Sequence, residues 1–391
     1  MKVVLISTYF PPHLGGVEVV AADLASALVR AGHDVTVVTT GRSAETGAHE
    51  VMDGYRIVRL SAWNGIEERT GIPFPLLSPS ALEVLHQLIC SADVVHVHDF
   101  LYPPCHAGIA LTALTGRPLV LSLHVARVPH TNPLTQLAQG LIAASMGRFA
   151  VKRAARVIVH NENVAAFAEK LGAPPRRIKL VRTGVSVSEF TPSTHKEKRA
   201  ALVRFGLPLD RPVVLFVGRL VPKKGYLQVI EATSPDIHLA LAGSGSLDGV
   251  VDHVTWLGPV ARGKLVELYR AASVLVAPYD REPFTLVLQE AMASGIPVIT
   301  TEEAEYHAAG LGFPAVKFAR RTSSALRSAI DEVMGDASLA VTMARAARRY
   351  AEENFDKRLH VQAVLEAYVT AVRPRRHHAR EGDAEAGLRH H

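Results

Sequence analysis

The sequence is poor in cysteine and has no long hydrophobic run. Cys90 and Cys105 are its two cysteines, which is too few for a disulfide framework, and their spacing is not that of a metal site. We therefore expect two buried or partly buried thiols and a reducing, cytoplasmic setting. The longest uncharged stretch runs from Phe100 to Gly116 and contains a Pro-Pro pair, whereas a membrane-spanning helix needs about 20 predominantly apolar residues.

The sequence also shows no export signal and no strong excess of one charge. The apolar run after Met1 is not followed by a small-residue cleavage site, so it is better interpreted as a buried strand. The 43 basic and 37 acidic residues give a net charge of +6. This moderate surplus suits an anionic small ligand or an anionic membrane surface, and it does not indicate nucleic-acid binding.

Short apolar runs recur along the chain, and most are followed by a helix-like segment. In the first half the predicted strands are Val3–Thr8, Val35–Thr40, Arg56–Leu60, Val94–His98, Leu119–His124, Val157–His160 and Lys179–Arg182. In the second half they are Val213–Val217, Leu239–Ala242, Val254–Leu257, Val274–Ala277 and Val298–Thr300. Strands rich in Val, Ile and Leu that alternate with helices are typical of a parallel sheet covered on both faces.

The sequence thus predicts an α/β protein with two doubly wound parallel-sheet domains. We place a first domain at 1–190 and a second at 205–355, joined by a polar linker at about 191–212 that contains three prolines. The tail at 373–391 lacks apolar periodicity, so we expect it to be disordered. Two such domains bring the carboxyl ends of both sheets to one cleft, where ligands bind in open α/β folds. Functional residues are therefore expected just after strands.

In the first domain, the ends of three strands carry candidate residues. Gly15 and Gly16 begin a helix and allow its backbone amides to approach an anion closely, although a plain helix-initiating turn is an equal alternative. The loop lacks the Gly-x-Gly-x-x-Gly of dinucleotide binders, which speaks against a hydride-transfer enzyme. His96 and His98 share one face of a strand, where packing or hydrogen bonding is expected more than metal binding. His124 ends the next strand.

In the second domain, a basic loop follows the first strand. Arg219 and Lys224 lie between Gly218 and Gly225, and two cations on a glycine-bounded loop suit a diphosphate, because Arg binds it bidentately and Lys acts as a point charge. The alternative is a solvated basic loop without a ligand. Gly243 lies in another tight loop after the next strand, which faces the same cleft.

The strongest candidates are two carboxylates. Glu282 lies in the loop after a strand, and Glu290 lies eight positions later on the helix that follows. Carboxylates accept hydrogen bonds from sugar hydroxyls, so this pair could hold the ribose and the hexose of one donor. A favourable interaction with the helix dipole would account for Glu282 without any function. It would not account for Glu290.

Taken together, these motifs resemble those of glycosyltransferase family 4. The resemblance covers about residue 2 to about residue 370. It rests on three patterns, which are Glu282-x7-Glu290 within Glu-Ala-Met-Ala-Ser-Gly-Ile-Pro-Val, Gly218-Arg219-Leu220…Lys223-Lys224-Gly225, and Pro11-Pro12-x-x-Gly15-Gly16-x-Glu18. It implies the GT-B architecture of two Rossmann-like domains and a retaining transfer from a nucleotide-diphosphate sugar, either a UDP-sugar or a GDP-sugar. It also implies that no metal or other cofactor is essential.

The resemblance implies a role for each candidate. Glu290 would bind the nucleotide ribose, Glu282 would lie beside the donor sugar, and His124 would contact that sugar. Arg219 and Lys224 would stabilise the leaving diphosphate. The remaining donor-binding positions it implies are Gly15, Gly16, Gly218, Gly243, Phe284, Thr285 and Leu286. A last helix at about 358–372 would cross back onto the first domain.

Two departures from the family pattern bear on the donor. Thr285 stands where the family often has glycine, and its side chain would narrow the sugar site. After Thr301 the family commonly has a Gly-Gly-x-x-Glu loop, whereas here Glu302-Glu303-Ala304-Glu305 follows at once. Two alternatives therefore stay open. One is another GT-B enzyme, such as a sugar phosphorylase or a nucleotide-sugar epimerase, and the other is a non-catalytic member of a polysaccharide assembly complex.

The acceptor is left open as a glycan, a lipid-linked saccharide or a small molecule. One segment bears on it, because Leu137–Arg156 combines apolar residues at helical spacing with four basic residues near its end. A basic amphipathic helix can lie on an anionic lipid surface. We therefore expect a cytoplasmic protein with possible peripheral contact to the inner face of the membrane. A core-packed helix with a solvated basic end is the alternative.

Overall fold

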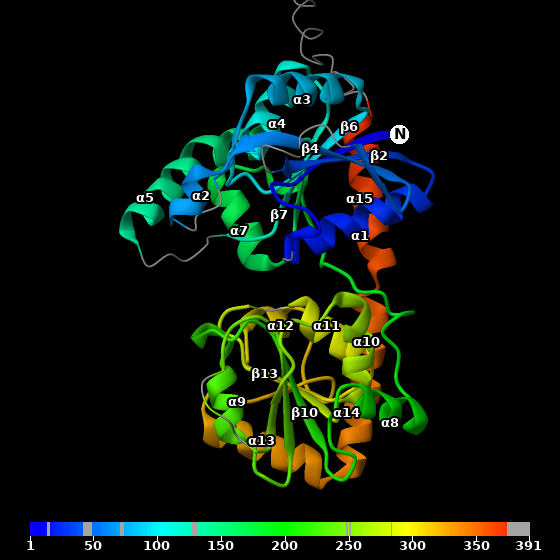
Figure 1. The fold of residues 1–391 in the computed structure, drawn as a ribbon. Coiled ribbons are helices and arrows are strands. Elements are labelled where there is room, and N and C mark those ends of the chain that lie inside the picture. Colours follow the sequence, from blue (N-terminus) through cyan, green and yellow to red (C-terminus); the bar gives the residue numbers. More distant parts are fainter. Residues whose placement is uncertain are drawn as a thin grey trace, which may run out of the picture.

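The structure is a computed structural model that describes residues 1–13, 16–41, 49–70, 74–126, 132–247, 249, 252–282 and 284–373. Two α/β halves lie one above the other, each built on its own sheet (Figure 1). All strands expected from the sequence are present, and the predicted fold class is confirmed. The tail was expected to be disordered, and its residues from 374 onward lie outside the described part of the chain.

The first half holds one large sheet with helices on both faces. Its strands are β1 (Lys2–Ile6), β2 (Asp34–Gly41), β3 (His49–Met52), β4 (Tyr55–Trp63), β5 (Leu76–Leu77), β6 (Val94–His98), β7 (Leu119–Leu123), β8 (Arg156–Val159) and β9 (Ile178–Leu180). Its helices are α1 (Gly16–Arg30), α2 (Gly65–Thr70), α3 (Pro79–Ser91), α4 (Pro103–Leu114), α5 (Pro133–Ile142), α6 (Arg148–Arg153) and α7 (Glu162–Leu171). A π-helical turn, Ala143–Gly147, joins α5 to α6.

The strand order of the first sheet is β3-β4-β2-β1-β6-β7-β8-β9, with β5 pairing to β4. The central strands are parallel, and β6 and β7 are buried along their whole length. This burial on both faces accounts for their nearly continuous Val, Leu and Ile content. The short strands β3 and β5 run antiparallel to β4 and were not predicted. Strand β3 has the mixed sequence His-Glu-Val-Met and β5 has only two residues, so neither forms a recognisable apolar run.

The second half holds a smaller parallel sheet with the order β12-β11-β10-β13-β14-β15. Its strands are β10 (Val213–Val217), β11 (His238–Ala242), β12 (Val254–Trp256), β13 (Val274–Ala277), β14 (Val298–Thr300) and β15 (Lys317–Phe318). Its helices are α8 (His195–Arg204), α9 (Tyr226–Ala232), α10 (Arg262–Ala271), α11 (Leu286–Ala293), α12 (Ala304–Ala308), α13 (Ser323–Gly335) and α14 (Ala337–Asn354).

The polar stretch that the sequence suggested as a linker contains helix α8, which corrects that interpretation. The helix begins with a capping box in which Thr194 and Glu197 satisfy each other's backbone amides. Lys198 then bonds to the carbonyl of Ala272 at 3.2 Å, and Leu202 is buried in the second core. His195, Lys196 and Glu197 lie on the exposed face of this helix, which packs on the second half.

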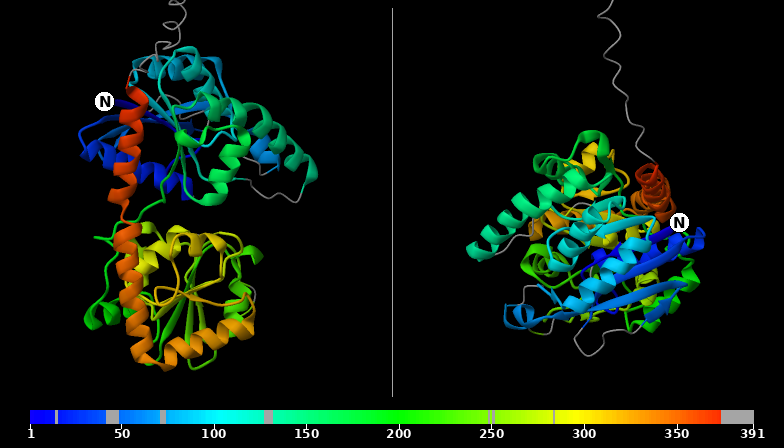
Figure 2. Two further views of the ribbon diagram at one scale, coloured as in Figure 1. Left: turned by 180° about the vertical axis from the view of Figure 1, so that it is seen from behind. Right: turned by 90° about the horizontal axis from the view of Figure 1, so that it is seen from above.

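The chain crosses between the halves twice, at one place. The backbone amide of Val185 donates to the carbonyl of Phe355 at 2.7 Å, and the amide of Lys357 donates to the carbonyl of Val185 at 2.9 Å. A Cβ at Gly184 would lie 2.5 Å from the Cα of Lys357, so the two crossings are in close backbone contact. Beyond them, α15 (Lys357–Val372) packs on the first half, where Tyr368 is fully buried (Figure 2).

This arrangement sets the carboxyl ends of the two sheets opposite each other. The loops after β1, β6 and β7 come from the first half, and the loops after β10, β11 and β13 come from the second. The single hinge region leaves the facing surfaces free to form a site between the halves. Of the helices described, none is both long enough and apolar enough to cross a membrane.

Candidate active site

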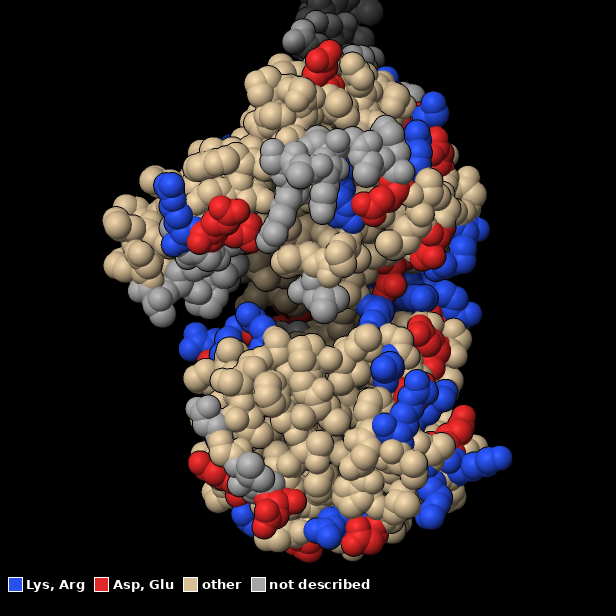
Figure 3. All heavy atoms as spheres, viewed as in Figure 1, with Lys and Arg blue, Asp and Glu red and all other residues tan. Residues whose placement is uncertain are grey.

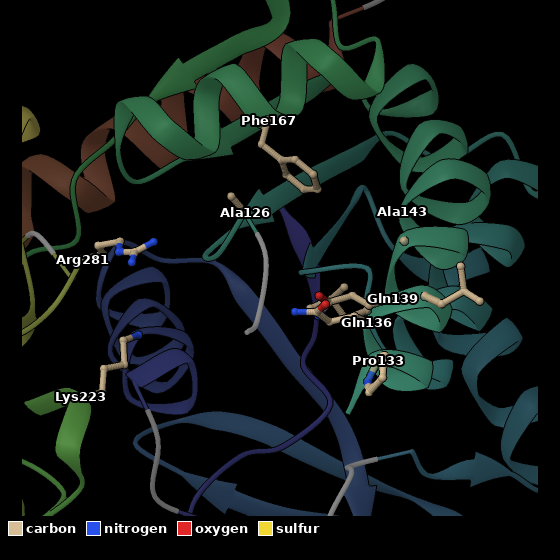
Figure 4. A pocket seen from close by; sticks show the side chains of 11 residues that line it. Ala126, Pro133, Gln136, Gln139, Ala143, Phe167, Lys223 and Arg281 are labelled. Atoms are coloured by element: carbon tan, nitrogen blue, oxygen red, sulfur yellow. The ribbon is translucent and has the colours of Figure 1, made fainter. Parts of the chain in front are cut away.

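A hollow separates the two halves, and basic side chains gather along the rim of the second half (Figure 3). A cavity of about 560 Å³ lies here and is lined from both sides. Leu101 and Phe167 belong to the first half, whereas Lys223 and Arg281 belong to the second (Figure 4). The cleft predicted from the two sheets is therefore present, and it carries positive charge on one wall.

The loop after β10 is held close to the loop after β11. The amide of Gly218 donates to the carbonyl of Ala242 at 2.8 Å. Gly243 has a φ of +145°, and a Cβ on it would lie 1.9 Å from the carbonyl oxygen of Gly218. No other residue fits at such a contact. The loop that begins at Gly218 leaves Arg219 exposed at the surface. The Arg219 side chain makes no hydrogen bond or ion pair with any described residue.

Lys224 and Glu282 lie next to Lys223, which lines the cavity. The Lys224 amine donates to Oε2 of Glu282, while the Lys223 amine lies 2.8 Å from Oε1 of the same carboxylate. The Lys224 amine also lies 3.9 Å from the centroid of the Tyr279 ring. Burial lowers the pKa of Lys224, and the Glu282 carboxylate opposes that effect. Burial would raise the pKa of Glu282, but the attraction of Lys224 and Lys223 outweighs it and the pKa is lowered.

Glu290 is buried on α11 and is held by one hydrogen bond. The phenol of Tyr269 donates to its Oε2 at 2.9 Å. Burial raises the pKa of Glu290 to about 7, against the lowering effects of Tyr269 and Arg262. Arg262 itself pairs at 2.6 Å with Asp23 on α1, across the cleft. Glu290 is therefore a carboxylate kept in an unfavourable environment beside the junction of the two halves, which is characteristic of functional sites.

The segment between the two glutamates forms the start of α11. Thr285 is the N-cap residue, and its hydroxyl accepts from the amide of Leu288 at 3.4 Å. The Phe284 side chain is buried against the rings of Tyr306 and Phe355, and Leu286 is half-buried against the same core. Of these predicted donor-binding residues, Phe284 could therefore meet a ligand only through its backbone.

His124 lies on the opposite wall, at the end of β7, within a column of histidines. Its Nε2 is 3.0 Å from Nδ1 of His98, and its backbone amide donates to Asp99 at 2.9 Å. Its ring also lies against that of His160, with 4.5 Å between the ring centroids and a tilt of 36°. Burial lowers the pKa of each of these histidines, so they are neutral near pH 7. The column continues to His96, whose two ring nitrogens bond to Tyr368 and Ser122.

Gly16 begins α1 on the same wall, and a Cβ there would meet open space. Its predicted neighbour Gly15 lies outside the described residues.

The cysteines are free, and burial raises the pKa of Cys105 to about 12. Across the described ranges, no three His, Cys, Asp or Glu side chains form a group that could hold a metal ion.

Among the predicted residues of the second half, Lys224 is in direct contact with Glu282, and the loop of Gly218 packs against Gly243. Both Glu282 and Glu290 act electrostatically on Tyr279, and Arg219 acts on Lys224. His124 and Gly16 belong to the first half, just after β7 and at the start of α1. Sequence reasoning missed Tyr279 and Tyr269, which hold Lys224 and Glu290. The position of Tyr279 just after β13 was the available signal, whereas nothing local marks Tyr269 in mid-helix.

Two family models cover most of the chain. The one described as Glycosyltransferase Family 4 matches residues 14–189, and the one described as Glycosyl transferases group 1 matches residues 197–350. A D-inositol 3-phosphate glycosyltransferase of Xylanimonas cellulosilytica is 30% identical over 327 residues, covering 73% of this chain and 75% of that protein. The glycogen synthase of Mycobacterium tuberculosis is 26% identical, with 96% of each chain covered.

Among solved structures, Anabaena HepE in complex with UDP and glucose is similar in fold. It has a TM-score of 0.74 and 17% sequence identity, and the match covers 94% of this chain and 99% of that chain. The prediction of a GT-B arrangement with two Rossmann-like domains is confirmed by this likeness and by the two parallel sheets.

Proposed function

We propose that this chain transfers a sugar from a nucleotide-diphosphate donor to an acceptor with retention of configuration. The chain belongs to glycosyltransferase family 4. The observation that carries this proposal is the charged group on the second half, where Lys224 contacts Glu282 and Arg219 acts electrostatically on Lys224. Cations suit a diphosphate, and carboxylates suit the hydroxyls of a sugar.

In this proposal the second half binds the donor. Glu290 accepts hydrogen bonds from the ribose hydroxyls through the carboxylate oxygen that Tyr269 leaves free. Arg219 and Lys224 bind the diphosphate and stabilise the negative charge that develops on it as the glycosidic bond breaks. Burial of Lys224 strengthens that interaction, because charges attract more strongly where water is excluded. The two cations supply the charge for which other enzymes use a metal.

In the same proposal the first half binds the acceptor and faces the donor sugar with His124. A neutral imidazole can exchange hydrogen bonds with a sugar hydroxyl without adding charge. The donor phosphate helps to remove the acceptor proton, so no side chain is assigned as a base. The donor is a UDP-sugar or a GDP-sugar.

A nucleotide screen tests the proposed donor class. Either UDP or GDP, at 100 times its Kd, should stabilise the protein by about 2.7 kcal/mol, which a thermal shift detects. The matching nucleotide sugar should then release nucleotide when acceptors are added. Stabilisation by neither UDP nor GDP would refute the proposal, and interconversion of free nucleotide sugars without transfer would indicate an epimerase instead.

We also propose that the protein is cytoplasmic and touches the membrane through α5. No residue of α5 is buried, and the apolar side chains Leu134, Leu137 and Leu141 are 74%, 61% and 62% exposed. The helix projects from the first half (Figure 1). An apolar helix face followed by the basic residues Lys152 and Arg153 suits an anionic lipid surface.

Flotation with liposomes tests this contact. The protein should float with vesicles that contain anionic lipid at low salt, and less so at 0.5 M salt, where charges are screened beyond about 4 Å. Leu137→Gln combined with Leu141→Gln should abolish flotation. A protein that stays at the bottom of the gradient at low salt would contradict the proposal.

A further inference from the structure

A second pocket lies in the first half and opens beside the interdomain cavity. Its volume is about 420 Å³, and Leu101 lines both it and the interdomain cavity. It is built by the loops after β1 and β6, by the first turn of α1, by α2, and by Val125, which follows His124. We call it the acidic pocket, and the lining residues used below are Tyr9, Glu18, Glu67, His98, Asp99 and Tyr102.

Three carboxyl groups face the acidic pocket. They are Glu18, Glu67 and Asp99, and no Lys or Arg occurs among the described residues that line it. Burial raises the pKa of Asp99 to about 7, so the negative charge near neutral pH comes mainly from the two glutamates. The N-terminus of α1 would favour an anion here, but Glu18 already occupies its first turn.

The polar groups of the pocket are only partly used within the protein. Glu67 accepts from the Tyr9 phenol at 2.5 Å, and Glu18 pairs with His13 at 3.1 Å. Each carboxylate therefore has an oxygen that can accept a further hydrogen bond. His98 is 3% exposed, and its Nε2 has no hydrogen-bond partner among the described residues. An unpartnered buried nitrogen in a pocket wall is costly unless a ligand bonds to it.

The ligand that suits this wall carries hydroxyl groups and no negative charge. Hydroxyls donate to carboxylates and can also bond to the neutral imidazole of His98. A phosphate would lie beside Glu18 and Glu67 with no described Lys or Arg of the pocket to bind it. Repulsion between like charges in a partly buried site lowers affinity by at least about tenfold for each close pair.

We propose that the acidic pocket binds the acceptor and selects an uncharged, polyhydroxylated acceptor over its phosphorylated counterpart. This inference rests on the proposed function, because it takes the cleft wall opposite Lys224 as the acceptor side. It separates this chain from the D-inositol 3-phosphate glycosyltransferase of Xylanimonas cellulosilytica, with which it shares 30% sequence identity.

Matched acceptor pairs test the proposal. Nucleotide release from the donor is measured with glucose and glucose 6-phosphate, mannose and mannose 6-phosphate, and myo-inositol and myo-inositol 3-phosphate. At least one uncharged member should accelerate release, with a kcat/KM at least about tenfold above that of its phosphorylated partner. A phosphorylated member that outperforms its uncharged partner would overturn the proposal, and so would the lack of acceleration by every uncharged member.

A pair of variants on α2 localises the effect. Glu67→Gln should narrow the preference for the uncharged acceptor about tenfold, because it removes one negative charge from the pocket. Glu68→Gln changes the exposed neighbour and should leave the preference unchanged. Equal preferences in the two variants would count against the pocket. Donor binding is measured separately by thermal shift, so a protein that binds no nucleotide refutes the proposed function rather than the acceptor assignment.

Discussion

Replacing Lys224 by alanine should lower kcat for sugar transfer about 10²–10³-fold, the range seen when one group that stabilises a developing negative charge is removed. The Lys224 amine is mostly buried and is fixed by Glu282 and the Tyr279 ring. Its position therefore needs no rearrangement when charge develops on the leaving diphosphate. Initial rates at saturating donor and acceptor provide the measurement.

Lys223→Ala is the matched control for this variant. Lys223 pairs with the same carboxylate but is more exposed, with 42% of its side chain accessible against 14% for Lys224. Solvent weakens its interaction with a diphosphate, so we expect a loss of no more than about tenfold. Circular dichroism should be unchanged in both variants. A Lys224→Ala enzyme with wild-type turnover would show that the amine does not stabilise the leaving group.

Replacing Glu290 by glutamine should weaken nucleotide binding and stabilise the empty protein at alkaline pH. The pKa of Glu290 is raised by burial from 4.5 to about 7. The folded state then binds its proton more tightly than the unfolded state, so stability is full below pH 4.5 and is lost as the pH rises toward 7. This change corresponds to roughly 3 kcal/mol in the wild type.

Glutamine removes that pH dependence because it cannot ionise. Urea unfolding at pH 5 and pH 8 should show the wild type losing more stability than Glu290→Gln between the two values, by a difference of roughly 3 kcal/mol. Nucleotide affinity should fall about tenfold or more, since hydrogen bonds to a charged group contribute about 1.5–3 kcal/mol. Glu353→Gln, on the exposed face of α14, should change neither property. Identical pH profiles for wild type and Glu290→Gln would contradict the assignment.

Most of the fold could be predicted from the sequence, because long buried strands leave a continuous apolar pattern. Strand β10 is five buried apolar residues between turns, and such a segment can hardly be anything but a parallel strand in this context. Helix α8 could not be predicted from its composition. Its many charged residues obscure the apolar periodicity of its buried face. The signal that identifies its start is the Thr194-x-x-Glu197 capping box.

The candidate site was predictable where the chain brings its residues together locally. Glu282 and Glu290 belong to one strand-loop-helix segment, so their spacing carries the information. The acidic pocket has no such spacing, because Tyr9, Glu67 and Tyr102 come from three separate segments. The acidic pocket forms only when α2 and the loop after β6 pack against the loop after β1.

The central claim is that cations of the second half bind the diphosphate of a nucleotide whose ribose is held by Glu290. Calorimetric titration with the nucleoside, its monophosphate and its diphosphate tests this claim most directly, using the base selected by the nucleotide screen. Wild-type protein should bind the diphosphate at least about 30-fold more tightly than the nucleoside, since two charge-assisted hydrogen bonds contribute at least about 2 kcal/mol. Arg219→Ala combined with Lys224→Ala should remove that gain, whereas equal affinities for nucleoside and diphosphate in the wild type would contradict the account.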